Sequence, residues 1–165
     1  MKRTAVAAAV LTAAFAAPAA AQEVILGLGY SDFSRAGAED GALASVEYMH
    51  RPFYEGRVLS ARVGAAFDVQ DSGDVFFGAG VSGVWDLRRD WFVEASVMPG
   101  VYSESVDLND LGSTFEIRSQ LAVGKRFLNG RALSLALSHK SNASTANDNP
   151  GVDTVTLRYH IPLDG

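Results

Sequence analysis

From about residue 23 onward, apolar and polar residues alternate along the chain with a period of two. This period is typical of β-strands, in which successive side chains point to opposite faces. No amphipathic helix of useful length is evident after Gln22. The alternation predicts eight strands, at residues 23–32, 41–51, 57–70, 74–87, 91–102, 114–127, 131–141 and 153–163. The predicted fold class is therefore all-β.

The two faces of these strands differ in a way that indicates the surroundings of the sheet. The apolar faces are nearly uncharged, whereas the polar faces hold glycine, serine and charges of both signs: Glu47, Arg62, Asp68, Glu94, Glu116, Arg118 and Arg158. The runs are also longer than most soluble strands, and they match the roughly 9–11 residues that a tilted strand needs to cross a bilayer. These features predict an eight-stranded antiparallel transmembrane β-barrel with its apolar face toward lipid. The alternative is a soluble lipocalin-like barrel with the apolar faces inside.

The connections between the predicted strands give the barrel an orientation. Pro52 to Gly56, Arg88 to Asp90 and Leu128-Asn129-Gly130 are short turns, and Asn-Gly is a strong hairpin signal. If both termini are periplasmic, these turns face the periplasm, as expected for such barrels. The connections after Asp32, Gln70, Tyr102 and Ser141 then face outward.

The N-terminus and the composition indicate where the protein works. Met1-Lys2-Arg3, an alanine-rich apolar run and a small-residue site ending at Ala21 have the form of a secretory signal peptide. We predict a signal peptide at 1–21 and a barrel at 22–165, exported to the cell outer membrane. The chain has no cysteine, so disulfides cannot hold it. Its formal charge of −5 argues against a nucleic-acid partner, because phosphate binding needs a basic surface.

Three residue types used in ester hydrolysis lie at the last outer hairpin. His139 and Ser141 end the seventh predicted strand, and Asp153 begins the eighth. By the alternation all three lie on the apolar face, where ionisable groups are costly, and antiparallel pairing brings them together at the outer rim. A serine becomes a nucleophile when a histidine takes its proton and an acid orients that histidine. Asn142, Asn149 and backbone around Gly151 are candidate oxyanion donors. On spacing alone, a merely solvated polar hairpin remains the alternative.

The string His139-x-Ser141-Asn142-Ala143, then Asn149-Pro150-Gly151, then an acid twelve residues after the serine, resembles the outer-membrane lipid A 3-O-deacylase (PagL-type) family. The resemblance is sharp over about residues 131–163 and elsewhere concerns only the pattern of a signal peptide and eight strands. It implies hydrolysis of the acyl ester at the 3-position of lipid A. By position, Ser141 would be the nucleophile, His139 the general base and Asp153 the orienting acid.

This chain departs from the family pattern at one position, and the resemblance also implies a set of partners. The family usually has glutamate where this chain has Asp153, so the shorter aspartate must sit closer to His139 or act through water. The expected partners are lipopolysaccharide and outer-membrane lipid, with a homodimer left open. We expect no metal or other cofactor, because the three histidines fall on separate strands. The competing functions are a non-catalytic structural or adhesive barrel and an inactive relative of the deacylases.

Overall fold

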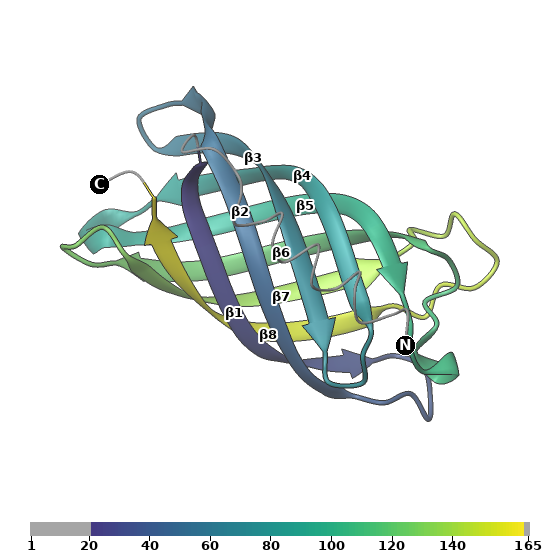
Figure 1. Cartoon of the computed structure of the whole chain (residues 1–165). Coiled ribbons are helices and arrows are strands. Elements are labelled where there is room, and N and C mark those ends of the chain that lie inside the picture. The colour runs from purple at the N-terminus through teal and green to yellow at the C-terminus, as the bar shows by residue number, and fades with distance from the viewer. Residues whose placement is uncertain (1–20, 164–165) are drawn as a thin grey trace.

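The computed structural model describes residues 21–163, which form a closed barrel in which each strand pairs with its neighbours in chain order and β1 closes against β8. Figure 1 shows the tilted wall that these strands make. All neighbouring pairs are antiparallel, as predicted. The strands are β1 (Ala21–Phe33), β2 (Gly41–Glu55), β3 (Leu59–Gln70), β4 (Val75–Asp86), β5 (Trp91–Ser103), β6 (Phe115–Arg126), β7 (Ala132–Ser141) and β8 (Val152–Pro162). Two short 3-10 turns, η1 (Arg88–Asp90) and η2 (Asp107–Asn109), lie in connections.

The predicted signal peptide, 1–21, lies outside the described residues except for Ala21, where β1 begins. One predicted turn is wrong at its start. β2 continues through Pro52 to Glu55, and its register against β3 shifts on both sides of Pro52. Proline lacks the N–H of a regular ladder, and a bulge accommodates it without ending the strand. No helix among residues 21–163 is long and apolar enough to cross a membrane.

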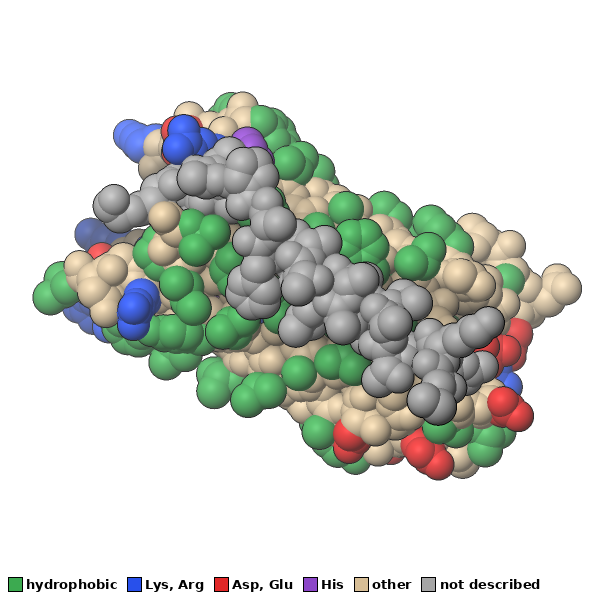
Figure 2. Space-filling view, viewed as in Figure 1, with side chains coloured by type: hydrophobic (Ala, Val, Ile, Leu, Met, Phe, Trp, Pro, Cys, Tyr) green, Lys and Arg blue, Asp and Glu red, His purple; other side chains and the backbone are tan. Residues whose placement is uncertain are grey.

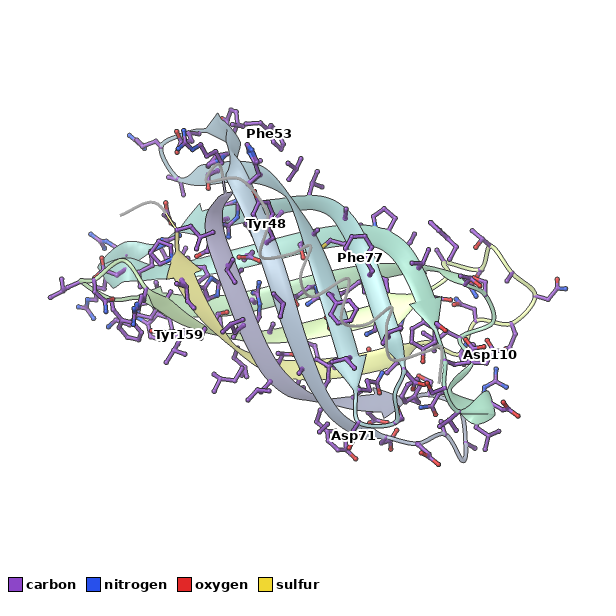
Figure 3. All side chains as sticks on the ribbon, viewed as in Figure 1. Tyr48, Phe53, Asp71, Phe77, Asp110 and Tyr159 are labelled. Carbon is purple, nitrogen blue, oxygen red and sulfur yellow. The ribbon has the colours of Figure 1, made fainter. Side chains whose placement is uncertain are left out.

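The orientation of the two faces is the one that the charge pattern predicted. Leu28, Leu121, Leu137 and Leu157 are more than half exposed, although they lie in the middle of strands. Phe77 and Tyr48 project from the outside of the wall in Figure 3. Exposed apolar side chains on every strand would be unfavourable in water, and they are the surface that a bilayer covers.

The inside of the barrel is filled by polar and charged side chains that pair across it. Arg158 contacts Glu47 at 2.9 Å and Glu94 at 3.0 Å, and Arg118 contacts the other oxygen of Glu47 at 2.8 Å. All four of these side chains are buried. A buried charge is tolerated when it is paired, so this network explains how the sequence places charges inside a membrane barrel.

The network continues from the centre toward both ends. Toward the long loops, the Lys140 ammonium lies 3.0 Å from Asp68. Toward the short turns, Arg62 bridges Glu94 at 3.1 Å and Glu23 at 2.6 Å. The pairs join strands that are not neighbours in the wall, and they therefore fix the strands across the interior as well as along it.

The two ends of the barrel differ in length of connection and in charge. The short turns lie at the left end of Figure 1, where β1 begins and β8 ends, and the longer loops lie at the right. Lys and Arg side chains gather at the turn end and Asp and Glu at the loop end in Figure 2. The short-turn end is the periplasmic one in barrels of this kind.

The loop end is closed by a small core under the loops. Phe33, Phe76, Tyr102, Leu111 and Val152 form a buried apolar cluster. Above it, the buried Asn109 donates its amide to the Asp74 carboxylate, and the Tyr102 hydroxyl donates to the Asn109 carbonyl at 2.9 Å. These contacts connect the loops to one another and support the hairpin between β7 and β8.

Candidate active site

His139 and Asp153 meet on the outer surface of the barrel at its loop end. They are directly opposite each other in the β7–β8 ladder. The His139 Nδ1 atom lies 2.8 Å from an Asp153 carboxylate oxygen. The shorter side chain thus reaches the imidazole directly, without a bridging water. About half of each side chain is exposed, 49% for His139 and 58% for Asp153, so both are accessible from the bilayer side.

Ser141 lies two residues beyond His139 on the same outward face, and it is held there by its neighbours in sequence. Lys140 is buried and pairs with Asp68, and Asn142 is fully buried under the loops. Successive strand residues point to opposite faces, so the inward side chains of Lys140 and Asn142 place Ser141 on the outer face. No hydrogen bond joins Ser141 to His139 within residues 21–163. Such bonds between a nucleophile and its base often form only when substrate binds.

Asn142 orients the loop that follows the serine. Both hydrogens of its side-chain amide are used, at 3.0 Å to the Leu111 carbonyl and 2.7 Å to the Asp148 carbonyl. Its backbone N–H donates to the Asn149 side-chain oxygen at 3.0 Å. Asn149 is exposed, and this bond leaves its amide nitrogen, Nδ2, without a partner among the described residues. The amide of Asn149 is therefore oriented with its donors free.

Gly151 packs against one edge of the His139 ring. Its φ of +71° is one that side-chain-bearing residues rarely adopt. A Cβ atom at this position would lie 2.8 Å from His139 Cε1 and 3.3 Å from His139 Nε2. The missing side chain lets the loop backbone approach the imidazole on the edge that carries Nε2, the nitrogen not bound to Asp153.

The register also brings up two residues that the alternation alone did not single out. Ser119 of β6 pairs with His139 on the side away from Asp153, and Asp32 of β1 pairs with Asp153. Both side chains are exposed on the outer face. Cross-strand neighbours of this kind depend on strand register, which residue spacing within one strand does not give.

The arrangement has the chemistry of acyl transfer. An imidazole bound to a carboxylate, a serine two residues away on the same face and an oriented amide in the following loop are the residue types that an esterase site uses. Within residues 21–163, no group of three or more His, Asp or Glu side chains is arranged to hold a metal ion.

Comparisons with known proteins point to one family. A segment of 73 residues is 30% identical to the lipid A deacylase PagL of Pseudomonas aeruginosa, covering 44% of this chain and 42% of that protein. The fold matches the crystal structure of the outer membrane enzyme PagL with a TM-score of 0.70 and 20% identity, over 85% of this chain and 99% of that one.

Other small barrels share the architecture less closely. The crystal structure of neisserial surface protein A (NspA) matches with a TM-score of 0.59 and 12% identity, over 84% of this chain and 95% of that one. A de novo designed transmembrane β-barrel matches with a TM-score of 0.56 and 10% identity, over 87% and 95%. At these identities the likeness concerns the fold alone.

The decisive comparison covers the barrel from β1 to β8. Residues 28–162 match the family described as lipid A 3-O-deacylase (PagL), and this range contains His139, Ser141 and Asp153. Together with the outward-facing wall, this match places the protein in the outer membrane. The chain is a member of the lipid A 3-O-deacylase (PagL) family.

Proposed function

We propose that this barrel hydrolyses the ester that links an acyl chain to the 3-position of lipid A, with Ser141 as nucleophile. The observation that carries the proposal is the His139–Asp153 hydrogen bond of 2.8 Å on the outer wall, two residues from Ser141. On a lipid-facing surface an ionisable pair is costly and adds little to folding. A catalytic role accounts for its position.

The reaction follows from the two nitrogens of His139. Nδ1–H donates to Asp153, which fixes the ring and leaves the lone pair of Nε2 free to take a proton. The Ser141 hydroxyl loses its proton to Nε2 as its oxygen attacks the ester carbonyl. Collapse of the tetrahedral intermediate releases the sugar hydroxyl, which takes the proton from Nε2. Water then attacks the acyl-serine by the same path, and the fatty acid leaves.

Asn149 and Gly151 are the proposed donors to the oxyanion. The Asn149 amide is oriented by its bond to the Asn142 backbone, and Gly151 brings its backbone beside the base. Preoriented donors of this type lower the barrier more than mobile ones, because no reorganisation is needed during the reaction. Asn142 supplies no side-chain donor to this mechanism, since its amide hydrogens are both bound, and its role is to position Asn149.

The substrate reaches this site laterally. The barrel interior is packed with paired charges, and an eight-stranded barrel has room for little more than its own side chains. Lipid A of the outer leaflet would instead lie against the exposed outer faces of β7 and β8, with its ester at the level of Ser141. The homodimer left open by the sequence is not needed for this reaction, because the three residues lie on two neighbouring strands of one chain.

The test is mass spectrometry of lipid A from cells that express the wild type, Ser141→Ala or His139→Ala. The proposal expects lipid A lacking the 3-position acyl chain only with the wild type. Equal amounts of folded barrel in the membrane are the control. Unchanged acylation with a correctly inserted wild type would leave a non-catalytic barrel or an inactive relative. Loss of an acyl chain from another position would contradict the 3-position assignment.

A further inference from the structure

The turn end of the barrel carries a cationic surface with its own geometry, far from the proposed active site. Its connections and strand ends hold Arg51, Arg57, Arg88, Arg89, Lys125, Arg126 and Arg131 against Glu55, Asp86 and Asp90. Figure 2 shows Lys and Arg side chains gathered at the left end of the molecule, which is the turn end. A barrel in a membrane meets lipid headgroups at this level, so the charge acts on those headgroups first.

Two of these cations, Lys125 and Arg131, lie on the lipid-facing side and have no acidic partner among residues 21–163. Trp91, Lys125, Leu133 and Tyr159 occupy one row across β5, β6, β7 and β8. Arg131 precedes Leu133 by two residues and is therefore the diagonal neighbour of Lys125, at about 7–8 Å. Among the ion pairs of residues 21–163, neither Lys125 nor Arg131 contacts a carboxylate, whereas Arg126 pairs with Asp86.

Aromatic side chains hold both cations at the surface. The Lys125 ammonium lies 5.8 Å from the centre of the Trp91 ring. The Arg131 guanidinium donates to the Tyr159 hydroxyl at 2.9 Å. Tyr159 lies at the turn end in Figure 3. An aromatic neighbour orients a cation without neutralising it, so both charges remain free to bind an anion.

An open pocket of about 580 Å³ adjoins Lys125, one member of this pair. It is lined by Asp90, Lys125, Arg126, Phe127, Leu128 and Asn129. Phe127 is 44% exposed and Leu128 is fully exposed, so the pocket joins apolar surface to positive charge. An anionic lipid matches both parts of this surface, because its acyl chains are apolar and its headgroup is negative. A free phosphate matches only the positive charge.

We propose that Lys125 and Arg131, framed by Trp91 and Tyr159, form a binding site for the phosphate of an anionic phospholipid in the periplasmic leaflet. The acyl chains of that lipid lie along the exposed faces of Val123 and Leu135. The site is separate from the deacylase proposal, because it lies at the opposite end of the barrel and in the other leaflet. Each cation near a charged lipid surface contributes roughly a fivefold preference, or about thirty-fold for the pair at low salt.

The test uses the folded full barrel in a zwitterionic detergent, with bound lipid counted by native mass spectrometry. Phosphatidylglycerol and phosphatidylcholine are offered at equal concentration, because they differ in headgroup charge. We expect the wild type to retain phosphatidylglycerol preferentially, and the Lys125→Gln/Arg131→Gln double variant to lose most of this preference. The matched control is Arg88→Gln/Arg89→Gln, which removes the same charge from a turn outside the aromatic frame and should keep the preference within about twofold.

Three results would overturn the proposal. One is a wild type that does not distinguish the two lipids, and another is an equal loss in both double variants, which would indicate unspecific charge attraction. The third is displacement of phosphatidylglycerol by millimolar inorganic phosphate, which would assign the site to free phosphate. A difference in gel migration between heated and unheated samples confirms that each variant is folded. Deacylation of lipid A in detergent should be unchanged by Lys125→Gln/Arg131→Gln, so failure here and failure of the proposed function are distinguishable.

Discussion

Replacing Gly151 with alanine tests how closely the loop backbone fits His139, the proposed catalytic base. The added Cβ would lie 2.8 Å from His139 Cε1. Carbon atoms in contact prefer about 3.5–4.0 Å, so the ring or the loop must move by roughly 0.7–1.2 Å. A misplacement of about 1 Å near reacting atoms can lower the rate by about 10²-fold. We therefore expect Gly151→Ala to lower kcat for lipid A deacylation by about two orders of magnitude.

Part of any effect will come from the backbone, and a matched variant measures that part. An alanine at positive φ costs about 1–2 kcal/mol of stability. Gly130, in the β6–β7 turn, has a similar φ of +79°, but a Cβ there would meet only Pro162 Cγ at an ordinary 3.5 Å. Gly130→Ala should thus show a similar loss of stability and unchanged activity.

The assay is steady-state release of fatty acid from lipid A in mixed micelles, with urea unfolding of each variant measured in parallel. The reasoning is refuted if Gly151→Ala keeps wild-type kcat, or if Gly130→Ala loses as much activity as Gly151→Ala. In the first case the loop does not constrain His139. In the second case the loss reflects general destabilisation of the barrel.

Substitutions at three further positions test the proposed oxyanion donor, the proposed orienting acid and the buried charges of the interior. Asn149→Ala should lower kcat by about 10²–10³-fold with little change in KM, measured in the same micellar assay, because it removes a donor used mainly in the transition state; a rise in KM alone would assign it to substrate binding. Asp153→Asn should lower kcat by about 10³–10⁴-fold, since an amide cannot stabilise charged His139, whereas Asp153→Glu should retain activity; equal rates for the two variants would exclude the proposed role of the acid. Glu47→Gln should destabilise the barrel by about 3–5 kcal/mol, because it leaves Arg118 and Arg158 short of a buried partner. The readout is the free energy of unfolding in urea, and Glu55→Gln at the exposed end of β2 should stay within about 0.5 kcal/mol of the wild type. A Glu47→Gln free energy of unfolding equal to that of the wild type would show that the remaining carboxylates compensate.

Much of this fold follows from the alternation of side chains, because a membrane barrel needs apolar residues on the face toward lipid and accepts polar residues on the face toward the interior. Charges of Glu47, Glu94 and Arg158 on the polar faces required an interior where they meet one another, and the structure confirms it. The pairing of His139 with Asp153 also follows from the sequence, since one hairpin connects their strands. The continuation of β2 past Pro52 does not follow, because a bulge looks like a turn when only residue types are read.

The contacts that the sequence does not reveal are those between strands that are not consecutive. Arg118 of β6 contacts Glu47 of β2 only because of barrel closure and strand stagger. Asn142 follows the last residue of β7, and its burial depends on Leu111 from a different loop. A polar residue in an Asn- and Ser-rich segment is expected to be solvated, and nothing in the local pattern indicates otherwise. Its positioning role is therefore visible only in three dimensions.

The most direct test of the central claim is covalent labelling of the folded barrel with a lipid-soluble, serine-directed phosphonate ester. Peptide mass spectrometry then identifies the modified residue. The account predicts that Ser141 alone is modified, that Asp153→Asn slows the labelling, and that Ser141→Ala abolishes it. Two results would contradict the assignment of Ser141 as the nucleophile. One is modification of Ser119, which pairs with His139 from the neighbouring strand β6. The other is labelling that persists in Ser141→Ala.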